Sequence, residues 1–560
     1  MKRRIEIYDT SLRDGAQQQG VNFSVADKLK IIDLLSSFGI DCIEGGWPGA
    51  IPKDTELFKS SSTPLYAFGS TRKPNITSAD DQQLLSLKDA IENAHENTRS
   101  KRHRGICLVA KTDVLHVELA LKTTNEENLR MIEDSVRFFD ALDYEYDIIV
   151  DAEHYFDGFA RNKEYAVEAI ATAFKAGARC VVLCDTNGGA IPSVVSSVVA
   201  QTIQALELNY NITISNSLQS SSENEPPRIL GIHAHNDTGC AVANTLVAVE
   251  AGVAHVQGTV NEYGERTGNA NLLSVIANLV LKLDCEVSDS GKIELSKLYN
   301  LAHNIAEIAN ININVRQPYV GDIAFAHKAG LHTSALKVNS DLYQHINPKV
   351  VGNDLKIIIS EMAGRSSVEL KANELGFDIT ARKDVLDALT NKIKDLEQQG
   401  YAFDLADASF ELLLRGELGI LPHFFRLESW RAICERIGSR NSKVDAEAVV
   451  KLVAGEKRFV ALGEGEGPVN ALDNALSDAL KDVYPEIEDF ELVDYRVRLL
   501  DTSKGTDSIT RVLITFRNHH NNASWTTIGV GSNIIESSWE ALIDCYIFGL
   551  ISCGSNGIKE

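Results

Sequence analysis

The sequence predicts an α/β protein that begins with a parallel (β/α)8 barrel, or TIM barrel, followed by a helical linker region and a C-terminal α/β domain. Three observations support this. Eight short apolar runs alternate with helical segments up to about residue 260, and polar residues follow most of these runs. The pattern of strand-like and helical segments changes near residues 289 and 426. Alternating strands and helices are typical of parallel sheets that are covered by helices. We expect domains at residues 1–288, 289–425 and 426–560.

The expected barrel strands are short. They read RIEIYDT, IDCIEGG, LYAFGS, GICLVAK, DIIVDAE, RCVVLCD, ILGIHAH and HVQGTV. Helices are expected between them, for example at residues 24–39 and 162–177, and the second of these starts at an Asn and stops at a Gly, as helix caps prefer. A doubly wound open sheet is the alternative. The eight repeats and the residues at the strand ends favour the barrel.

The rest of the chain has two further textures. Residues 289–425 look mainly helical. From about residue 426, the strand-like runs VVKLVAG, RFVALGEGEG, DYRVRLLD and SITRVLITFRN alternate with the helical runs NALDNALSDALKDV and SSWEALIDCYIFGL. This order predicts a separate α/β domain and suggests an internal duplication. Two polar stretches, 75–105 and 216–228, are interpreted as surface insertions without an assigned function.

Composition excludes several classes of partner. The 560 residues carry a net charge of -23 and 44% hydrophobic residues. Nucleic acids and anionic membranes are bound by basic surfaces, so neither is an expected partner. The basic start MKRRIEIYDT is not followed by a long apolar segment, which argues against a signal peptide or a membrane span. Nine scattered cysteines without a CxxC pair favour reduced thiols and a cytoplasmic location.

Charged and polar residues gather after the expected barrel strands, where barrels of this kind carry their functional groups. Acids, an arginine and imidazoles are poor core material, so these positions predict a site at one mouth of the barrel. In chain order they are Asp9, Arg13, Asp14, Glu44, Asp151, Glu153, His154, Asp185, Thr186, Asn187, His233 and His235.

The motif HAHND is the sharpest local signal. His233 and His235 are two residues apart, so on a strand both side chains point to the same face. Two imidazoles can bind one metal ion if a carboxylate from the first strand supplies a third ligand. Mixed carboxylate, imidazole and water ligation suits Mn, Mg, Fe, Co or Zn. Two histidines that merely form hydrogen bonds are the alternative.

Arg13 and its neighbours have two interpretations each. A permanently charged guanidinium beside a metal can stabilise an oxyanion that develops on a keto substrate. Arg13 can instead pair with Glu44 or Asp9, and both interpretations can hold together. Glu153 and His154 are either acid–base groups or polar residues that order the barrel mouth.

At these residues the chain resembles a known family. DTSLRDGAQ, HAHNDTGCAVANTLVAVEAG and VQGTVNEYGERTGNANL resemble the signatures of the acyl-CoA-condensing, metal-dependent barrel enzymes. That family contains the 2-isopropylmalate, homocitrate and citramalate synthases, with the hydroxymethylglutaryl-CoA lyases as cousins. GEGEGPVNALDNAL, DYRVRLLD and TIGVGSNIIESSWEAL resemble the C-terminal regulatory domain of the synthases in leucine and isoleucine biosynthesis.

Two further stretches, EGGWPGAIPKD and DAEHYFDGF, are most similar to the longer citramalate synthases within this family. Isopropylmalate synthases tend toward Ser-Pro-Glu-Asp at strand 5, whereas this chain has Ala152-Glu153-His154-Tyr155 and keeps only the Glu. The departure favours pyruvate as the acceptor over a branched 2-oxo acid. 2-Isopropylmalate synthase, which uses 2-oxoisovalerate, is the alternative.

The resemblance implies roles for individual residues. Asp14, His233 and His235 match the metal ligands, and Asn269 matches a residue at or near the metal. Arg13 matches the arginine that polarises the substrate, and Thr186 matches a contact to the substrate carboxylate, while Glu44 and His154 are further expected substrate-binding residues. His332 matches a histidine that enters the active site from the partner subunit, where it would remove the acetyl-CoA methyl proton together with Glu153; His327 is the weaker candidate for this role.

The implied reaction is a Claisen-type condensation of acetyl-CoA with pyruvate, followed by thioester hydrolysis, which gives (R)-citramalate and CoA. It requires a divalent metal, with Mn, Mg or Zn as candidates. The resemblance further implies a homodimer and feedback inhibition by isoleucine. Two other functions were considered. A catalytically silent amino-acid sensor would not need a complete metal site, and the C-terminal regulatory domain argues against a C–C lyase.

Overall fold

The computed structural model describes residues 2–97, 104–142, 146–218, 227–288, 293–359, 364–435, 445–500 and 508–558. The chain divides into two compact units, Met1–Phe325 with Pro348–Asp354, and Ala326–Asn347 with Leu355–Glu560. Parts of both expected insertions, residues 98–103 and 219–226, lie outside the described residues.

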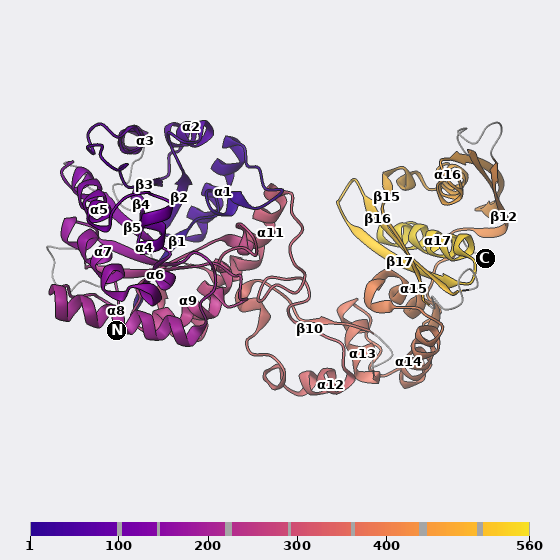
Figure 1. Ribbon diagram of the computed structural model, residues 1–560. Coiled ribbons are helices and arrows are strands. Elements are labelled where there is room, and N and C mark those ends of the chain that lie inside the picture. Colours follow the sequence, from indigo (N-terminus) through magenta and orange to yellow (C-terminus); the bar gives the residue numbers. More distant parts are fainter. Residues whose placement is uncertain are drawn as a thin grey trace. The chain divides into compact units, whose positions relative to one another are not determined.

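The first unit contains a closed barrel of parallel strands, which lies inside a ring of helices (Figure 1). Strand β1 pairs in parallel with β8, where Glu6 lies opposite His255, and also with β2, where Tyr8 lies opposite Cys42. This closure confirms the barrel and rules out the open sheet. The strands are β1 Arg4–Asp9, β2 Cys42–Gly46, β3 Tyr66–Ser70, β4 Gly105–Lys111, β5 Asp147–Glu153, β6 Cys180–Asp185, β7 Ile229–Ala234 and β8 His255–Gly258. A short strand β9, Glu286–Val287, adds to β1 at its start.

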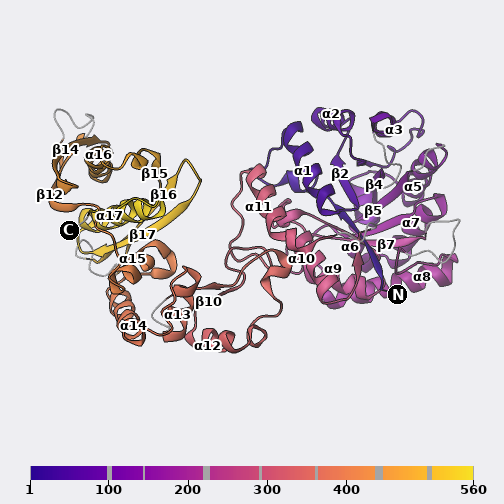
Figure 2. The same cartoon turned by 180° about the vertical axis from the view of Figure 1, so that it is seen from behind.

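The surrounding helices are seen from the other side in Figure 2. They are α1 Val25–Phe38, α2 Pro52–Ser60, α3 Gln82–Asn97, α4 Val114–Leu119, α5 Asn125–Asp140, α6 Tyr155–Arg161, α7 Lys163–Ala176, α8 Pro192–Tyr210, α9 Ala241–Glu250, α10 Leu272–Leu281 and α11 Leu298–Ala309. The Asn162 side chain caps the start of α7, and Gly177 ends it with a φ of 123°. Both expected caps of this helix are therefore confirmed.

The barrel interior follows the period of two that strands impose on their side chains. On β1, Glu6 and Tyr8 share a face, and on β8 His255 and Gln257 do. Because the same face of each strand points inward, polar residues spaced by two are stacked along the barrel axis rather than dispersed over the surface.

A charged network lies inside the barrel, near the starts of the strands. Arg179 donates from Nη2 to both oxygens of Glu6, at 2.9 and 3.0 Å, and its Nε is 2.8 Å from Asp147 Oδ1. His255 Nδ1 is 2.6 Å from Glu6 Oε2. Burial alone would raise the pKa of Glu6, but Arg179 and His255 more than offset it, and the pKa lies well below its usual value. This carboxylate therefore stays ionised within the barrel.

The second unit joins helices to two three-stranded antiparallel sheets. Its first part contains α12 Gly330–Val338, α13 Arg365–Glu374, α14 Lys383–Gln398, α15 Asp407–Glu417 and a two-strand pair of β10 Ala326–His327 with β11 Lys356–Ile357. Its second part contains β12 Arg426–Glu435, β13 Asp445–Ala454, β14 Lys457–Gly465, α16 Pro468–Leu480, β15 Phe490–Leu499, β16 Thr510–Asn518, β17 Ser524–Gly531 and α17 Ile534–Ser552.

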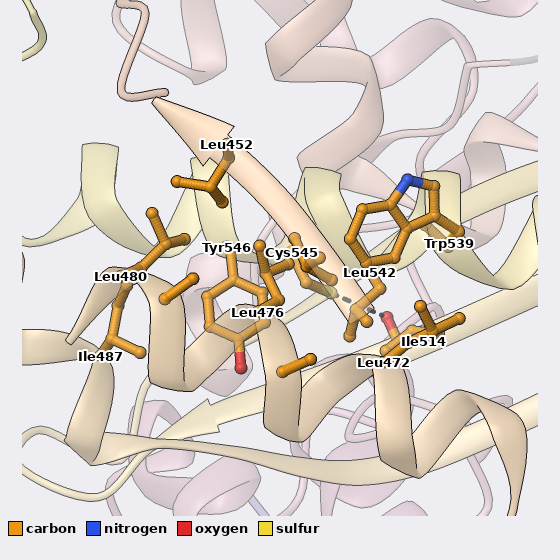
Figure 3. Packing of buried hydrophobic residues seen from close by; sticks show 14 of the residues in the cluster. Leu452, Leu472, Leu476, Leu480, Ile487, Ile514, Trp539, Leu542, Cys545 and Tyr546 are labelled. Atoms are coloured by element: carbon orange, nitrogen blue, oxygen red, sulfur yellow. Dashed lines mark hydrogen bonds between the residues drawn. The ribbon is translucent and has the colours of Figure 1, made fainter. Parts of the chain in front are cut away.

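The order strand–strand–strand–helix occurs twice in this second part, as the suggested duplication requires. Gly463 on β14 and Gly529 on β17 take equivalent places, because a Cβ on either would lie 2.3 Å or less from a backbone oxygen of the following helix. The absence of a side chain lets α16 and α17 approach their sheets closely. Figure 3 shows the resulting core, in which Leu472 and Leu476 of α16 and Leu542 and Tyr546 of α17 pack together.

Strands β12 and β17 were not among the strands expected from the sequence. Strand β12 is largely exposed at the edge of its sheet, so its side chains lack the clean apolar alternation that marks a half-buried strand. Among the described helices, none combines the length and the hydropathy that a membrane span requires.

The buried network gives a prediction for stability. Replacing Arg179→Met removes the guanidinium from the buried Glu6 charge and leaves it the contact with His255, so we expect the unfolding free energy to fall by about 3–5 kcal/mol. Because the pKa of Glu6 is depressed in the folded chain, this contribution is present at neutral pH and is lost as the pH falls into strong acid. Denaturant titration followed by circular dichroism measures the change.

Arg137→Met is the matched control, since Arg137 pairs with Glu133 one helical turn away and both side chains are exposed, at 59% and 43%. It should cost less than about 0.5 kcal/mol. Equal losses for the two variants would contradict a stabilising role for the network.

Candidate metal centre and active site

The loop after β1 is held by a buried turn. Asp9 accepts hydrogen bonds from the backbone N (3.0 Å) and the hydroxyl (2.8 Å) of Ser11, and the backbone N of Asp14 donates to Thr10 O at 2.9 Å. Burial raises the pKa of Asp9 to about 7, although the bonds from Ser11 oppose the shift. This turn fixes the direction in which Arg13 and Asp14 leave the strand.

Asp14 and the two histidines of HAHND converge. Asp14 Oδ2 is 3.2 Å from His233 Nε2 and 3.9 Å from His235 Nε2, and the two Nε2 atoms are 3.3 Å apart. Within the described part of the chain, these three residues are the one set of His, Cys, Asp and Glu side chains whose ligand atoms all lie within 4.8 Å of one another. All three residues are buried.

The protonation of this cluster suits a metal. Burial opposes ionisation of Asp14, yet Arg13 and His233 hold its pKa well below the usual range. Burial lowers the pKa of His235 to about 4, so its imidazole is neutral at pH 7, as a ligand must be. Burial also disfavours a charged His233, but its bond to Asp14 outweighs this and raises the pKa. A metal ion would replace that proton between the same two atoms.

Asn269 adds an amide to the cluster. Its Nδ2 donates to Asp14 Oδ2 at 2.8 Å and lies 3.2 Å from His233 Nε2, while its buried Oδ1 has no hydrogen-bond partner in the described residues. A half-turn of the amide would exchange the donor for the carbonyl oxygen, which can bind a metal. The mixed oxygen and nitrogen donors, together with this unpaired oxygen, fit a divalent cation.

Arg13 lies next to this cluster, held on two sides. Its Nε donates to Glu44 Oε2 at 2.6 Å, and its guanidinium carbon lies 3.8 Å from the centre of the Phe68 ring. Tyr8 OH donates to the other oxygen of Glu44 at 3.1 Å. Burial raises the pKa of Glu44 to about 7 although Arg13 opposes the shift. The pairing of Arg13 with Glu44 considered from the sequence is therefore present, and Arg13 still reaches the cavity.

A cavity of about 460 Å³ opens at the carboxyl ends of the barrel strands. Most of the predicted site residues line it, and Trp47, Phe68, Lys111 and Asp151 join them. The lining includes Arg13, Asp14, Trp47, Phe68, Arg72, Lys73, Lys111, Asp151, Glu153, Thr186, His233 and His235. Glu44, His154 and Asn269 are not among the lining residues, and they contact residues that are.

Glu153, the last residue of β5, and the following His154 have different contacts. Glu153 forms an ion pair with Lys111 at the edge of the cavity. His154 has a positive φ of 58°, its backbone N donates to Thr186 Oγ1 at 2.9 Å, and its ring stacks on His116 with the ring centres 3.7 Å apart. His154 therefore holds the loop that presents Thr186.

His332 lies on α12 in the second compact unit. The His332 ring stacks on Tyr343, with the ring centres 4.1 Å apart. The centre of the His327 ring lies 6.2 Å from that of His332.

Sequence reasoning named Asp151 without a role and missed the involvement of Lys111, Trp47 and Phe68 in the site. Asp151 and Lys111 could have been recognised from the sequence, because each occupies an inward position near the end of a barrel strand. Trp47 and Phe68 resemble ordinary core residues, and only the assembled cavity distinguishes them.

Family models match consecutive parts of the chain. Residues 4–305 match the HMGL-like model, residues 319–401 match the homocitrate synthase post-HMGL domain-like model, and residues 404–548 match the LeuA allosteric (dimerisation) domain.

Curated relatives match nearly the whole chain. The (R)-citramalate synthase of Streptomyces coelicolor is 46% identical over 98% of this chain and 97% of its own length. That of Aquifex aeolicus is 42% identical over the full length of both chains. A 2-isopropylmalate synthase from Ruminiclostridium cellulolyticum is 28% identical over the full length of both. The chain therefore belongs to the HMGL-like family and, within it, to the group of the (R)-citramalate synthases.

Proposed function

We propose that this protein condenses acetyl-CoA with pyruvate and water to give (R)-citramalate and CoA. The observation that carries the proposal is similarity along the whole chain, at 40–46% identity to five (R)-citramalate synthases and 26–28% to three 2-isopropylmalate synthases. The cluster of Asp14, His233 and His235 supports the same chemistry, because condensing a 2-oxo acid requires a polarised carbonyl.

Asp14, His233 and His235 would hold the divalent metal, and the amide of Asn269 would complete or support the set. When bound, Mn, Mg or Zn would supply a Lewis acid for the oxygens of pyruvate. Arg13 would donate to the carbonyl oxygen as negative charge develops there. Glu44 holds the guanidinium through the hydrogen bond from Arg13 Nε, and Thr186 would contact the pyruvate carboxylate.

Removal of the acetyl methyl proton requires a base beside the acceptor carbon. Glu153 lines the cavity, and its ion pair with Lys111 orients its carboxylate there. We assign the proton transfer to Glu153 together with His332 of a second subunit, so the active form would be a homodimer. Water would then hydrolyse the thioester and release CoA.

The C-terminal sheets would bind the feedback inhibitor, for which isoleucine is our candidate. Ile528 N donates to Ser409 Oγ at 3.0 Å, and Arg511 donates to the carbonyl oxygens of Gly400 and Tyr401. These bonds join β17 to α15 and β16 to the segment after α14, within the same compact unit, which also carries His332. We place the protein in the cytoplasm because all nine cysteines, each within the described residues, are free thiols.

The metal assignment predicts the behaviour of two variants. Asp14→Ala and His233→Ala should each lower CoA release from acetyl-CoA plus pyruvate by about a thousandfold or more, because the carbonyl loses its Lewis acid. A thiol-release assay measures this, with His303→Ala as the control, since the Nε2 of His303 on α11 donates to Val320 O at 3.0 Å and lies 3.9 Å from Asp322 Oδ1. Near-normal rates in the two site variants would remove the metal from the mechanism.

The acceptor assignment predicts a preference among 2-oxo acids. Pyruvate should give a kcat/KM about 10–200 times that of 2-oxoisovalerate, since a pocket that fits one methyl group discriminates against larger side chains by about this factor. The same thiol-release assay with a panel of 2-oxo acids measures it. A preference for 2-oxoisovalerate would instead favour isopropylmalate synthesis.

The regulatory assignment predicts an effect of isoleucine. Isoleucine should inhibit the full chain, and a chain cut after residue 425 should retain part of its catalysis and lose the inhibition. Circular dichroism checks the fold of the shortened chain, because the cut uncovers Ala402 and Ala406, which pack on Leu513 and Ile528. Inhibition that survives in a folded, shortened chain would contradict an effector site in the C-terminal sheets.

A further inference from the structure

Gln257 is a fully buried polar residue that connects one proposed metal ligand to the opposite wall of the barrel. It lies on β8, directly opposite His233 of β7 in the strand register. Its Oε1 is 2.8 Å from His233 Nδ1, and its Nε2 donates to Asp151 Oδ1 at 3.0 Å. Asp151 comes from β5 and is 4% exposed. A chain of hydrogen bonds therefore runs from Asp151 through Gln257 to His233.

The carboxylate at one end sets the direction of this chain. Asp151 Oδ1 accepts from the amide nitrogen of Gln257, which leaves the amide oxygen facing His233. That oxygen can only accept, so His233 carries its hydrogen on Nδ1. Once a metal displaces the proton that Nε2 shares with Asp14, the lone pair of His233 is on Nε2, which is the atom that faces Asp14 at 3.2 Å.

The second histidine has no such support. His235 Nδ1 is buried, and the described residues offer it no hydrogen-bond partner. Only His233 is thus fixed in both ring orientation and tautomer. In metal sites, a partner on the far nitrogen of an imidazole fixes these two properties and increases its basicity as a ligand.

We propose that Gln257 and Asp151 are positioning residues for the metal, acting by holding His233 in the Nδ1–H tautomer with Nε2 directed at the cation. This rests on the proposed metal-dependent function and adds residues to it. A buried glutamine can also be purely structural, with its two hydrogen bonds serving the packing of the barrel. The two accounts differ in what they predict for metal affinity.

The test measures Mn²⁺ binding directly, by the electron paramagnetic resonance signal of the free ion in titrations of the metal-stripped full chain. Gln257→Leu removes the acceptor at His233 Nδ1 and should weaken Mn²⁺ binding by about 10–100-fold. Gln257→Glu alone sets a second carboxylate against Asp151 and should also weaken binding by about tenfold.

Adding Asp151→Asn to Gln257→Glu restores the order of hydrogen-bond donors and acceptors between positions 151, 257 and 233. The new amide at position 151 donates to the new carboxylate at position 257, which again accepts from His233 Nδ1. Mn²⁺ affinity in this double variant should return to within about threefold of the parent. This rescue keeps the proposal testable if Gln257→Leu fails to fold, because a structural role for Gln257 predicts no recovery of metal affinity.

Gln317→Leu is the matched control, since Gln317 is a buried glutamine of the same unit whose Nε2 donates to Asn261 Oδ1 at 3.0 Å. It should leave Mn²⁺ affinity unchanged, whatever it does to melting temperature. Parent-like Mn²⁺ affinity in folded Gln257→Leu, or equal affinities for Gln257→Glu with and without Asp151→Asn, would overturn the positioning role alone. A parent chain that binds no Mn²⁺ would overturn the metal site of the proposed function as well.

Discussion

The buried carboxylate of Asp14 is the point on which the site depends. Arg13, Asn269, His233 and His235 all reach it, at distances between 2.8 and 3.9 Å. Burying a charge is costly unless it is paired, and the same region also buries Glu44 and Asp151. Arg13 is shared between Asp14 and Glu44, at 3.8 and 2.6 Å. A divalent cation held by Asp14 and the two imidazoles would add positive charge at this carboxylate, which links the stability of the barrel mouth to its chemistry.

The closure of the barrel brings the site residues of several strands together. Asp14 follows β1 and the histidines lie at the end of β7, while Glu44 and Phe68 approach Arg13 from β2 and β3. The hydrogen bond between Gln257 and Asp151 crosses from β8 to β5. An open sheet would hold β5 and β8 apart, and this bond would be lost. The inward period of two explains why residues distant in sequence arrive at the same level of one cavity.

Much of this could be predicted from the sequence. Strand ends rich in His, Asp, Glu and Arg identified the mouth of the barrel, and the spacing of His233 and His235 indicated their common face. Gln257 could not be recognised in the same way, because an isolated glutamine within an apolar strand has no local pattern. Phe68 and Trp47 look like core residues, and their contact with the cavity follows from tertiary packing. Strand β12 was missed because it is largely exposed and because a register shift between Leu427 and Ser429 breaks the alternation of the residues that pack on the core.

Anomalous diffraction from a crystal soaked in Mn²⁺ tests the central claim most directly, since it locates the ion without relying on turnover. The account predicts a manganese peak in contact with Asp14 Oδ2 and with Nε2 of both His233 and His235. It also predicts that Asn269 presents Oδ1 toward the ion, and that His233 Nδ1 keeps its contact with Gln257. A manganese peak elsewhere, or none at these three side chains, would contradict the account.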